Sequence, residues 1–110
     1  MKKVVRPWGN FNEFVKNRKC TVKIIEIKPG QQLSLQYHQK REEEWYFLDK
    51  AMVQLGNKKF RVKPGEIIKV HKRKAHRVIA GLRRVKFLEI SSGDFSEGDE
   101  IRIEDKYGRI

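Results

Sequence analysis

The chain has 110 residues, 38% of them hydrophobic, which suits one folded domain with a modest core and argues against a disordered chain. Basic residues outnumber acidic ones by 26 to 14, giving a net charge of +12, and no apolar run is long enough to cross a membrane. No signal-peptide pattern follows Met1-Lys2-Lys3, and the lone Cys20 cannot form an internal disulfide. We therefore expect a cytoplasmic protein that forms a single domain over residues 1–110.

The predicted elements are short β-strands, because β-branched and aromatic runs dominate and helical periodicity is weak. In chain order the strand candidates are residues 20–28, 33–38, 44–49, 51–55, 58–62, 67–71, 76–80 and 84–91. Pro-Gly pairs at 29–30 and 64–65 suit type II turns, and Gly56-Asn57 is a two-residue hairpin signal. This pattern predicts an all-β antiparallel barrel or sandwich.

The two terminal segments are less regular. The first 14 residues and the tail from Ser91 show no clear strand pattern. We expect both to pack on the barrel through their large side chains, namely Trp8, Phe11, Phe14, Phe95 and Tyr107.

Residues able to bind a metal recur at defined positions. Along an extended strand over residues 33–38, alternation puts Gln36 and His38 on one face, opposite the apolar set. Glu43 belongs to the next strand, and His76 opens a distant one. Each of these residues alone could be an ordinary surface polar group, but their joint spacing predicts a four-ligand metal site on a β scaffold.

The positive charge is compatible with nucleic-acid binding, with a phosphorylated substrate or with a charge-rich, heat-adapted surface. The densest basic run, residues 69–74, has no interleaved aromatic residues, and no nucleic-acid motif is present. Solvated surface is therefore the default interpretation, and no nucleic-acid or membrane partner is expected.

The ligand spacing resembles the two motifs of the cupin superfamily, whose members are small jelly-roll barrels of antiparallel strands with a metal inside. The first motif, usually Gly-x5-His-x-His-x4-Glu-x6-Gly, is matched in spacing by Gly30, Gln36, His38, Glu43 and Lys50. The second, usually Gly-x5-Pro-x-Gly-x2-His-x3-Asn, is matched by Gly65, His71, Arg73, His76 and Ala80. Neither match needs an insertion.

Glutamine at the first ligand position narrows the resemblance. This glutamine and five sequence stretches resemble those of the type II mannose-6-phosphate isomerases. Members of that family occur alone or as the C-terminal domain of bifunctional mannose-1-phosphate guanylyltransferases. The stretches are Arg6-Pro7-Trp8-Gly9, residues 33–38, residues 41–45, Ala75-His76-Arg77 and residues 104–109. The resemblance implies a cupin fold over nearly the whole chain and interconversion of mannose 6-phosphate and fructose 6-phosphate through an enediolate.

The resemblance also implies roles for individual residues. Gln36, His38, Glu43 and His76 would bind a divalent metal, with zinc favoured and manganese, cobalt, nickel or iron compatible. Arg41 and Arg109 would contact the phosphorylated sugar, with Arg77 as a further choice. The resemblance does not identify the proton-transfer base; Glu89 and Asp105 are the non-ligand carboxylates to consider first, with a structural role as the alternative for each. His71 is expected in an exposed loop and not on the metal.

Alternatives to catalysis stay open. A cupin of this kind could bind a phosphorylated sugar or another small anion without turning it over. By analogy with cupins that pack sheet against sheet, we expect a homodimer in which irregular terminal segments could be exchanged between subunits.

Overall fold

The computed structural model of the chain describes residues 1–93 and 96–109. Within them the strands are β1 (Lys2–Arg6), β2 (Gly9–Glu13), β3 (Cys20–Ile27), β4 (Leu35–His38), β5 (Arg41–Phe47), β6 (Ala51–Leu55), β7 (Lys58–Val62), β8 (Ile67–Val70), β9 (His76–Ile79), β10 (Val85–Gly93) and β11 (Glu100–Glu104). One 3-10 turn, η1 (Glu97–Asp99), precedes β11. None of the helical structure in these residues is long and apolar enough to span a membrane.

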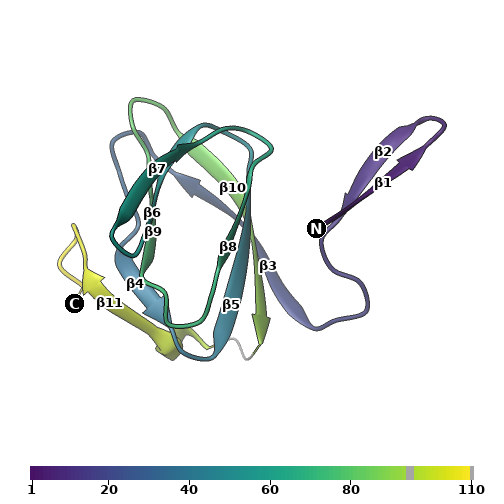
Figure 1. The fold of residues 1–110 in the computed structure, drawn as a ribbon. Helices are drawn as coiled ribbons and strands as arrows, with labels where there is room; N and C mark the ends of the chain where they lie inside the picture. The colour runs from purple at the N-terminus through teal and green to yellow at the C-terminus, as the bar shows by residue number, and fades with distance from the viewer. Residues whose placement is uncertain (94–95, 110) are drawn as a thin grey trace.

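Two antiparallel sheets face each other and form the barrel seen in Figure 1. One sheet has the strand order β3-β10-β5-β8, and the other has the order β11-β4-β9-β6-β7. Except for the hairpin β6-β7, neighbouring strands in these two sheets are far apart in sequence, so most contacts within the fold are long-range, as expected for an all-β barrel.

Strand β5 illustrates how alternation divides the barrel interior. Its inward residues are Arg41, Glu43, Trp45 and Phe47, all buried, whereas the intervening residues are exposed or partly exposed. The inner face of this strand therefore passes from two charged side chains to two aromatic ones. The barrel consequently has a polar end, where a site can form, and an apolar end, where the core packs.

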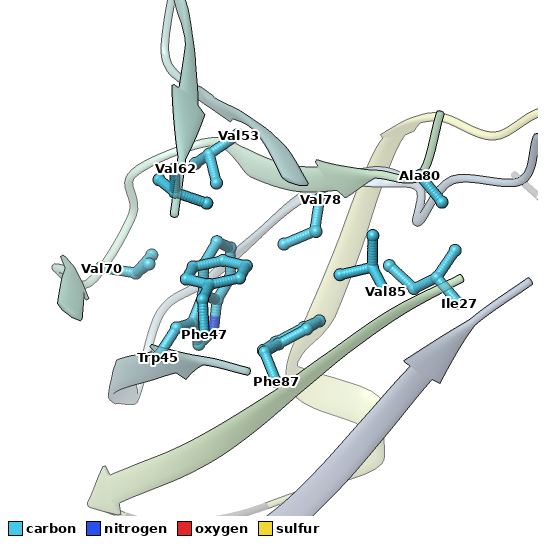
Figure 2. Packing of buried hydrophobic residues seen from close by; sticks show 10 residues of the cluster. All are labelled: Ile27, Trp45, Phe47, Val53, Val62, Val70, Val78, Ala80, Val85 and Phe87. Atoms are coloured by element: carbon cyan, nitrogen blue, oxygen red, sulfur yellow. The ribbon is translucent and has the colours of Figure 1, made fainter. Parts of the chain in front are cut away.

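The apolar end is closed by three aromatic rings, shown with their neighbours in Figure 2. Trp45 and Phe87 have ring centroids 5.4 Å apart, and Phe47 and Phe87 lie 5.2 Å apart. Valines from both sheets surround the rings. Burial of these side chains, worth roughly 1.5–3 kcal/mol each, holds the two sheets together beneath the polar end.

All eight strands predicted from the sequence are present, and the prediction of an antiparallel all-β barrel is confirmed. The expectation of irregular ends was wrong in two places. The tail forms β11, which pairs with β4 and widens the second sheet. The N-terminal segment forms a hairpin in which β1 and β2 pair only with each other.

The hairpin also corrects the expected packing of the terminal aromatic residues. It projects away from the barrel (Figure 1), and Trp8 and Phe11 stack on each other with centroids 6.4 Å apart, both remaining exposed. The two-residue turn Pro7-Trp8 closes the hairpin, and Gly9, which follows it, has a φ of +146° that favours glycine.

The other terminal aromatic residues behave differently. Phe14 meets the Tyr46 ring edge-on at 5.3 Å and does pack on the barrel, as expected. Tyr107 is half exposed and forms a hydrogen bond with the Gln31 side chain. Phe95 lies outside the described residues.

Candidate metal centre

Three of the four predicted ligands meet at the polar end of the barrel. His38 ends β4, Glu43 lies on β5 and His76 begins β9, so the two sheets jointly supply them. All three side chains are buried, and their ligand atoms lie within 4.8 Å of one another. Strand alternation explains this convergence, because each residue points inward from its own strand.

His76 is held in the tautomer that metal binding needs. Its Nδ1 lies 2.8 Å from the Lys74 carbonyl oxygen, which can only accept, so Nδ1 donates its proton there. The lone pair is then left on Nε2, which is 3.6 Å from Glu43 Oε1 and has no hydrogen-bond partner among the described residues. A buried acceptor without a donor costs free energy, and a metal ion would satisfy it.

His38 faces two charged neighbours. Its Nδ1 is 3.6 Å from Glu43 Oε2, and its Nε2 is 2.7 Å from Arg41 Nη2. A guanidinium can only donate, so Nε2 accepts this hydrogen bond and Nδ1 of the neutral ring carries the proton. For His38 to bind a metal ion, either Arg41 would release Nε2 or Nδ1 would give up its proton. Arg41 is itself buried and contacts both His38 and Glu43.

The Glu43 carboxylate is fixed by two donors besides the histidines. Trp45 Nε1 donates to Oε1 at 3.0 Å, and Arg41 Nε donates to Oε2 at 3.3 Å. A buried carboxylate is costly unless it is paired and hydrogen-bonded, and these contacts meet both conditions. Trp45, expected from the sequence only as a core or rim aromatic, therefore also orients a candidate ligand. The sequence contained a signal for this role, because Trp45 follows Glu43 by two residues and therefore lies on the same face of the strand.

Burial keeps both imidazoles neutral. It lowers the pKa of His38 to about 4, against the opposing pull of the Glu43 charge, and the Arg41 charge adds to the lowering. Burial likewise lowers the pKa of His76. Because metals bind neutral imidazole, proton competition at these two residues is weak at neutral pH.

Gln36 lies beside the three-residue cluster, directly opposite His76 in the pairing of β4 with β9. With its amide nitrogen turned toward Ser34 and Glu100, it donates to Ser34 Oγ at 2.6 Å and to Glu100 Oε1 at 3.1 Å. In that orientation the Glu100 carboxylate accepts a hydrogen bond from the amide nitrogen, and the amide oxygen of Gln36 does not face the carboxylate. The fourth ligand thus stays a prediction, with Gln36 on the correct face and strand position.

The loop before His76 has arginine where the motif usually has glycine, and its backbone is left-handed at that position. Arg73, at the motif's glycine position, adopts a φ of +63°, a conformation that favours glycine. Its backbone nitrogen donates to the His38 carbonyl oxygen at 2.6 Å. This bond ties the loop that presents one ligand to the strand that carries another.

A cavity of about 270 Å³ adjoins the metal centre. It is lined by Lys23, Ile25, Leu33, Ser34, Gln36, Arg41, Glu89, Glu100, Arg102 and Arg109. Its size and its mostly polar lining suit a small polar ligand better than a large apolar one. Lys23 and Arg102 were not singled out from the sequence, because only the pairing of β3 and β11 with other strands brings them to this cavity.

Glu89 and Asp105, the two candidate proton-transfer carboxylates, have opposite environments. Glu89 is buried in the cavity wall, and burial together with the nearby Glu43 charge raises its pKa to about 7. Asp105 instead accepts from Arg109 at Nε (2.7 Å) and Nη2 (3.0 Å), which holds the pKa of that carboxyl well below its usual range. Only Glu89 lines the cavity.

The remaining residues considered from the sequence differ in their position relative to the cavity. Arg109, paired with Asp105, is half exposed at the cavity rim. Arg77 is buried, with Nη2 3.7 Å from Glu104 Oε1, and is not part of the cavity lining. His71 is exposed and lies outside the ligand cluster, 3.9 Å from the Glu42 carboxylate.

An antiparallel barrel with buried imidazole and carboxylate side chains at one end is a cupin-like fold. Among solved structures, the fold resembles a cupin-2 domain from Rhodospirillum rubrum with a TM-score of 0.65 and 19% identity, covering 79% of this chain and 64% of that one. A conserved double-stranded β-helix protein from Klebsiella pneumoniae gives a TM-score of 0.69 with 17% identity, over 83% and 80% of the two chains.

Sequence comparison identifies the family within this class. The model of the family described as mannose-6-phosphate isomerase C-terminal matches residues 1–105. Mannose-1-phosphate guanylyltransferase 2 of Escherichia coli O157:H7 is 37% identical over 109 residues, which is 96% of this chain and 23% of that protein. The chain belongs to the mannose-6-phosphate isomerase C-terminal family and spans less than a quarter of that relative's length.

Proposed function

We propose that this chain is a metal-dependent sugar-phosphate isomerase that interconverts mannose 6-phosphate and fructose 6-phosphate. The observation that carries the proposal is the buried cluster of His38, Glu43 and His76, beside a polar cavity, in a member of this family. A small aldose phosphate is compatible with the volume and the charged lining of that cavity.

The donor set fits a divalent metal. Two neutral imidazoles and a carboxylate suit zinc first and also accept manganese, cobalt, nickel or iron, and the partnerless His76 Nε2 is one point of attachment. Gln36 would supply a further oxygen. When bound, the ion supplies Lewis-acid polarisation of the sugar carbonyl.

The chain's own residues supply the proton transfer. Aldose-to-ketose conversion removes the proton from C2, forms an enediolate and returns a proton to C1, while the hydroxyl proton passes from O2 to O1. Glu89, in the cavity wall, is the carboxylate that accepts and returns the carbon-bound proton. Arg41 stabilises the negative charge that develops on the sugar oxygens, and Arg109 at the rim pairs with the phosphate.

The test is an isomerisation assay on metal-replete protein with mannose 6-phosphate, run with a panel of other aldose phosphates. The proposal expects fructose 6-phosphate to form, with activity lost in His76→Ala and kept in His71→Ala. Glu89→Gln should bind sugar phosphate and lower kcat by 10²-fold or more. Absence of any interconversion by the metal-replete wild type would contradict the proposal.

A non-catalytic cupin that binds a phosphorylated sugar is the second candidate. The observation in its favour is the basic lining of the cavity, with Lys23, Arg41, Arg102 and Arg109, which can hold an anionic phosphate whether or not a reaction follows. Calorimetry that records metal-dependent binding of mannose 6-phosphate, with no product after prolonged incubation, would favour this candidate over the isomerase.

A further inference from the structure

One carboxylate of the cavity wall is not used by the proposed chemistry. Glu100 begins β11, lines the cavity and has only 18% of its side chain exposed. It is not a member of the buried ligand cluster found among the described residues. A charged group at this depth needs hydrogen-bond partners, and the partners of Glu100 indicate its role.

The first partner of Glu100 is the side-chain amide of Gln36. A carboxylate oxygen can only accept a hydrogen bond, so the amide group that faces Glu100 is the NH2. In that orientation the amide nitrogen lies 3.1 Å from Glu100 Oε1, 3.2 Å from Glu100 Oε2 and 2.6 Å from Ser34 Oγ. The amide oxygen, which is the atom able to bind a metal ion, is therefore turned away from Glu100 and Ser34.

Strand pairing shows what lies on the two sides of Gln36. It pairs with Arg102 of β11 on one side and with His76 of β9 on the other. A nitrogen held by a side chain of β11 leaves the oxygen toward β9, the strand that carries the candidate ligand His76. Glu100 thus occupies the position from which the amide can be oriented.

Glu100 is itself held in place from two directions. Arg102 Nη2 lies 2.7 Å from Glu100 Oε2. The preceding residue, Asp99, accepts hydrogen bonds from the backbone nitrogens of Gln39 at 3.1 Å and Lys40 at 2.9 Å. These contacts tie the start of β11 to the turn after β4, so the carboxylate is fixed relative to the strand that carries Gln36.

We propose that Glu100 is a positioning residue of the metal centre, whose carboxylate holds the Gln36 amide with its oxygen directed at the bound ion. The inference rests on the metal centre of the proposed function and adds to it a residue outside the ligand spacing. Without Glu100, the amide is free to rotate and to present its nitrogen to the ion. Partners that orient a ligand typically matter for metal affinity almost as much as the ligand itself.

Four variants separate orientation from charge. Glu100→Ala removes the carboxylate, whereas Glu100→Gln removes the charge and keeps an oxygen that can accept from the Gln36 amide. Gln36→Ala removes the candidate ligand. Glu104→Ala is the matched control, because Glu104 is the other carboxylate of β11, is 69% exposed and does not line the cavity.

The assay is a Co²⁺ titration of the full chain against a competing chelator, with urea unfolding of each metal-free variant in parallel. Glu100→Ala should weaken cobalt binding by about 3- to 10-fold, and no more than Gln36→Ala does, because its effect passes through Gln36. The double variant should bind cobalt as Gln36→Ala does, since the two residues act as one unit. Glu100→Gln should stay within about 2-fold of the wild type, and Glu104→Ala should bind as the wild type does.

The visible absorption of the bound cobalt gives a second readout, because it follows the coordination geometry of the ion. Glu100→Ala and Gln36→Ala should shift this spectrum in the same way, whereas Glu104→Ala should leave it unchanged. A loss of fold stability alone would not produce a matching pair of spectra.

Three results in a cobalt-binding wild type would overturn the proposal. They are unchanged affinity in Glu100→Ala, an equal loss in Glu100→Gln, and a double variant in which the two single losses multiply. A wild type that takes up no cobalt would overturn the metal centre together with the role of Glu100. A cobalt-binding wild type that isomerises no sugar phosphate would contradict the proposed function alone, so the two failures are distinguishable.

Discussion

Trp45→Phe should weaken metal binding although Trp45 is not a ligand. The fully buried Trp45 ring packs against Phe47 and Phe87, and its Nε1 donates to Glu43 Oε1 at 3.0 Å. Phenylalanine keeps most of the packing and removes the donor. A hydrogen bond to a charged group contributes about 1.5–3 kcal/mol, and loss of a group that orients a ligand typically costs 10–100-fold in metal affinity.

The assay is a metal titration against a competing chelator, with urea unfolding of the metal-free protein in parallel. Phe47→Leu is the matched control, because Phe47 is equally buried and contacts Trp45 but makes no polar contact with the site. Both variants should lose stability, by about 1–3 kcal/mol, but only Trp45→Phe should lose metal affinity. Equal metal affinity in the two variants would refute the orienting role of Trp45.

Three further predictions concern the site and the strands that carry it. Gly93→Ala should lower the free energy of unfolding in urea by about 2 kcal/mol or more. The reason is that Gly93 has a φ of +105° and a Cβ there would lie 2.6 Å from the Lys40 carbonyl oxygen. Gly81→Ala is the control and should change the free energy of unfolding little, because no atom lies within 4 Å of its Cβ position. Arg41→Lys should lower kcat/KM by about 10–100-fold, since lysine cannot bridge two groups with a planar fork; unchanged kinetics would remove Arg41 from the mechanism. Gln36→Ala should weaken metal binding by about 10-fold while retaining stoichiometric uptake, and an unaltered dissociation constant would exclude Gln36 as a ligand.

The barrel was predictable because its strands carry strong local signals. Pro-Gly and Gly-Asn pairs mark turns, and β-branched runs mark the strands between them, so residues 51–55 and 58–62 are strands with the predicted bounds. The convergence of Glu43 with His38 and His76 was predicted from the joint spacing of these residues. The predicted strand began only at residue 44, and the observed bounds of β5 are what place Glu43 on the inward face of that strand.

Contacts made only by the folded chain were not predictable in the same way. The N-terminal hairpin depends on a short Pro-Trp turn in a mostly polar segment, and β11 gains its regularity from pairing with β4. The hydrogen bond from Trp45 to Glu43 and the contact between Arg41 and His38 depend on side-chain directions inside the barrel. Sequence periodicity specifies a face, but it does not specify which atoms meet on that face.

The most direct test of the metal centre is the number of divalent ions bound per chain, measured by elemental analysis after zinc loading and exhaustive dialysis. Wild type and His71→Ala should each retain one ion per chain, because His71 lies outside the ligand cluster, whereas His76→Ala should retain close to none. Retention of a full equivalent by folded His76→Ala, or its absence from the wild type, would contradict the assignment of His38, Glu43 and His76 as a metal centre.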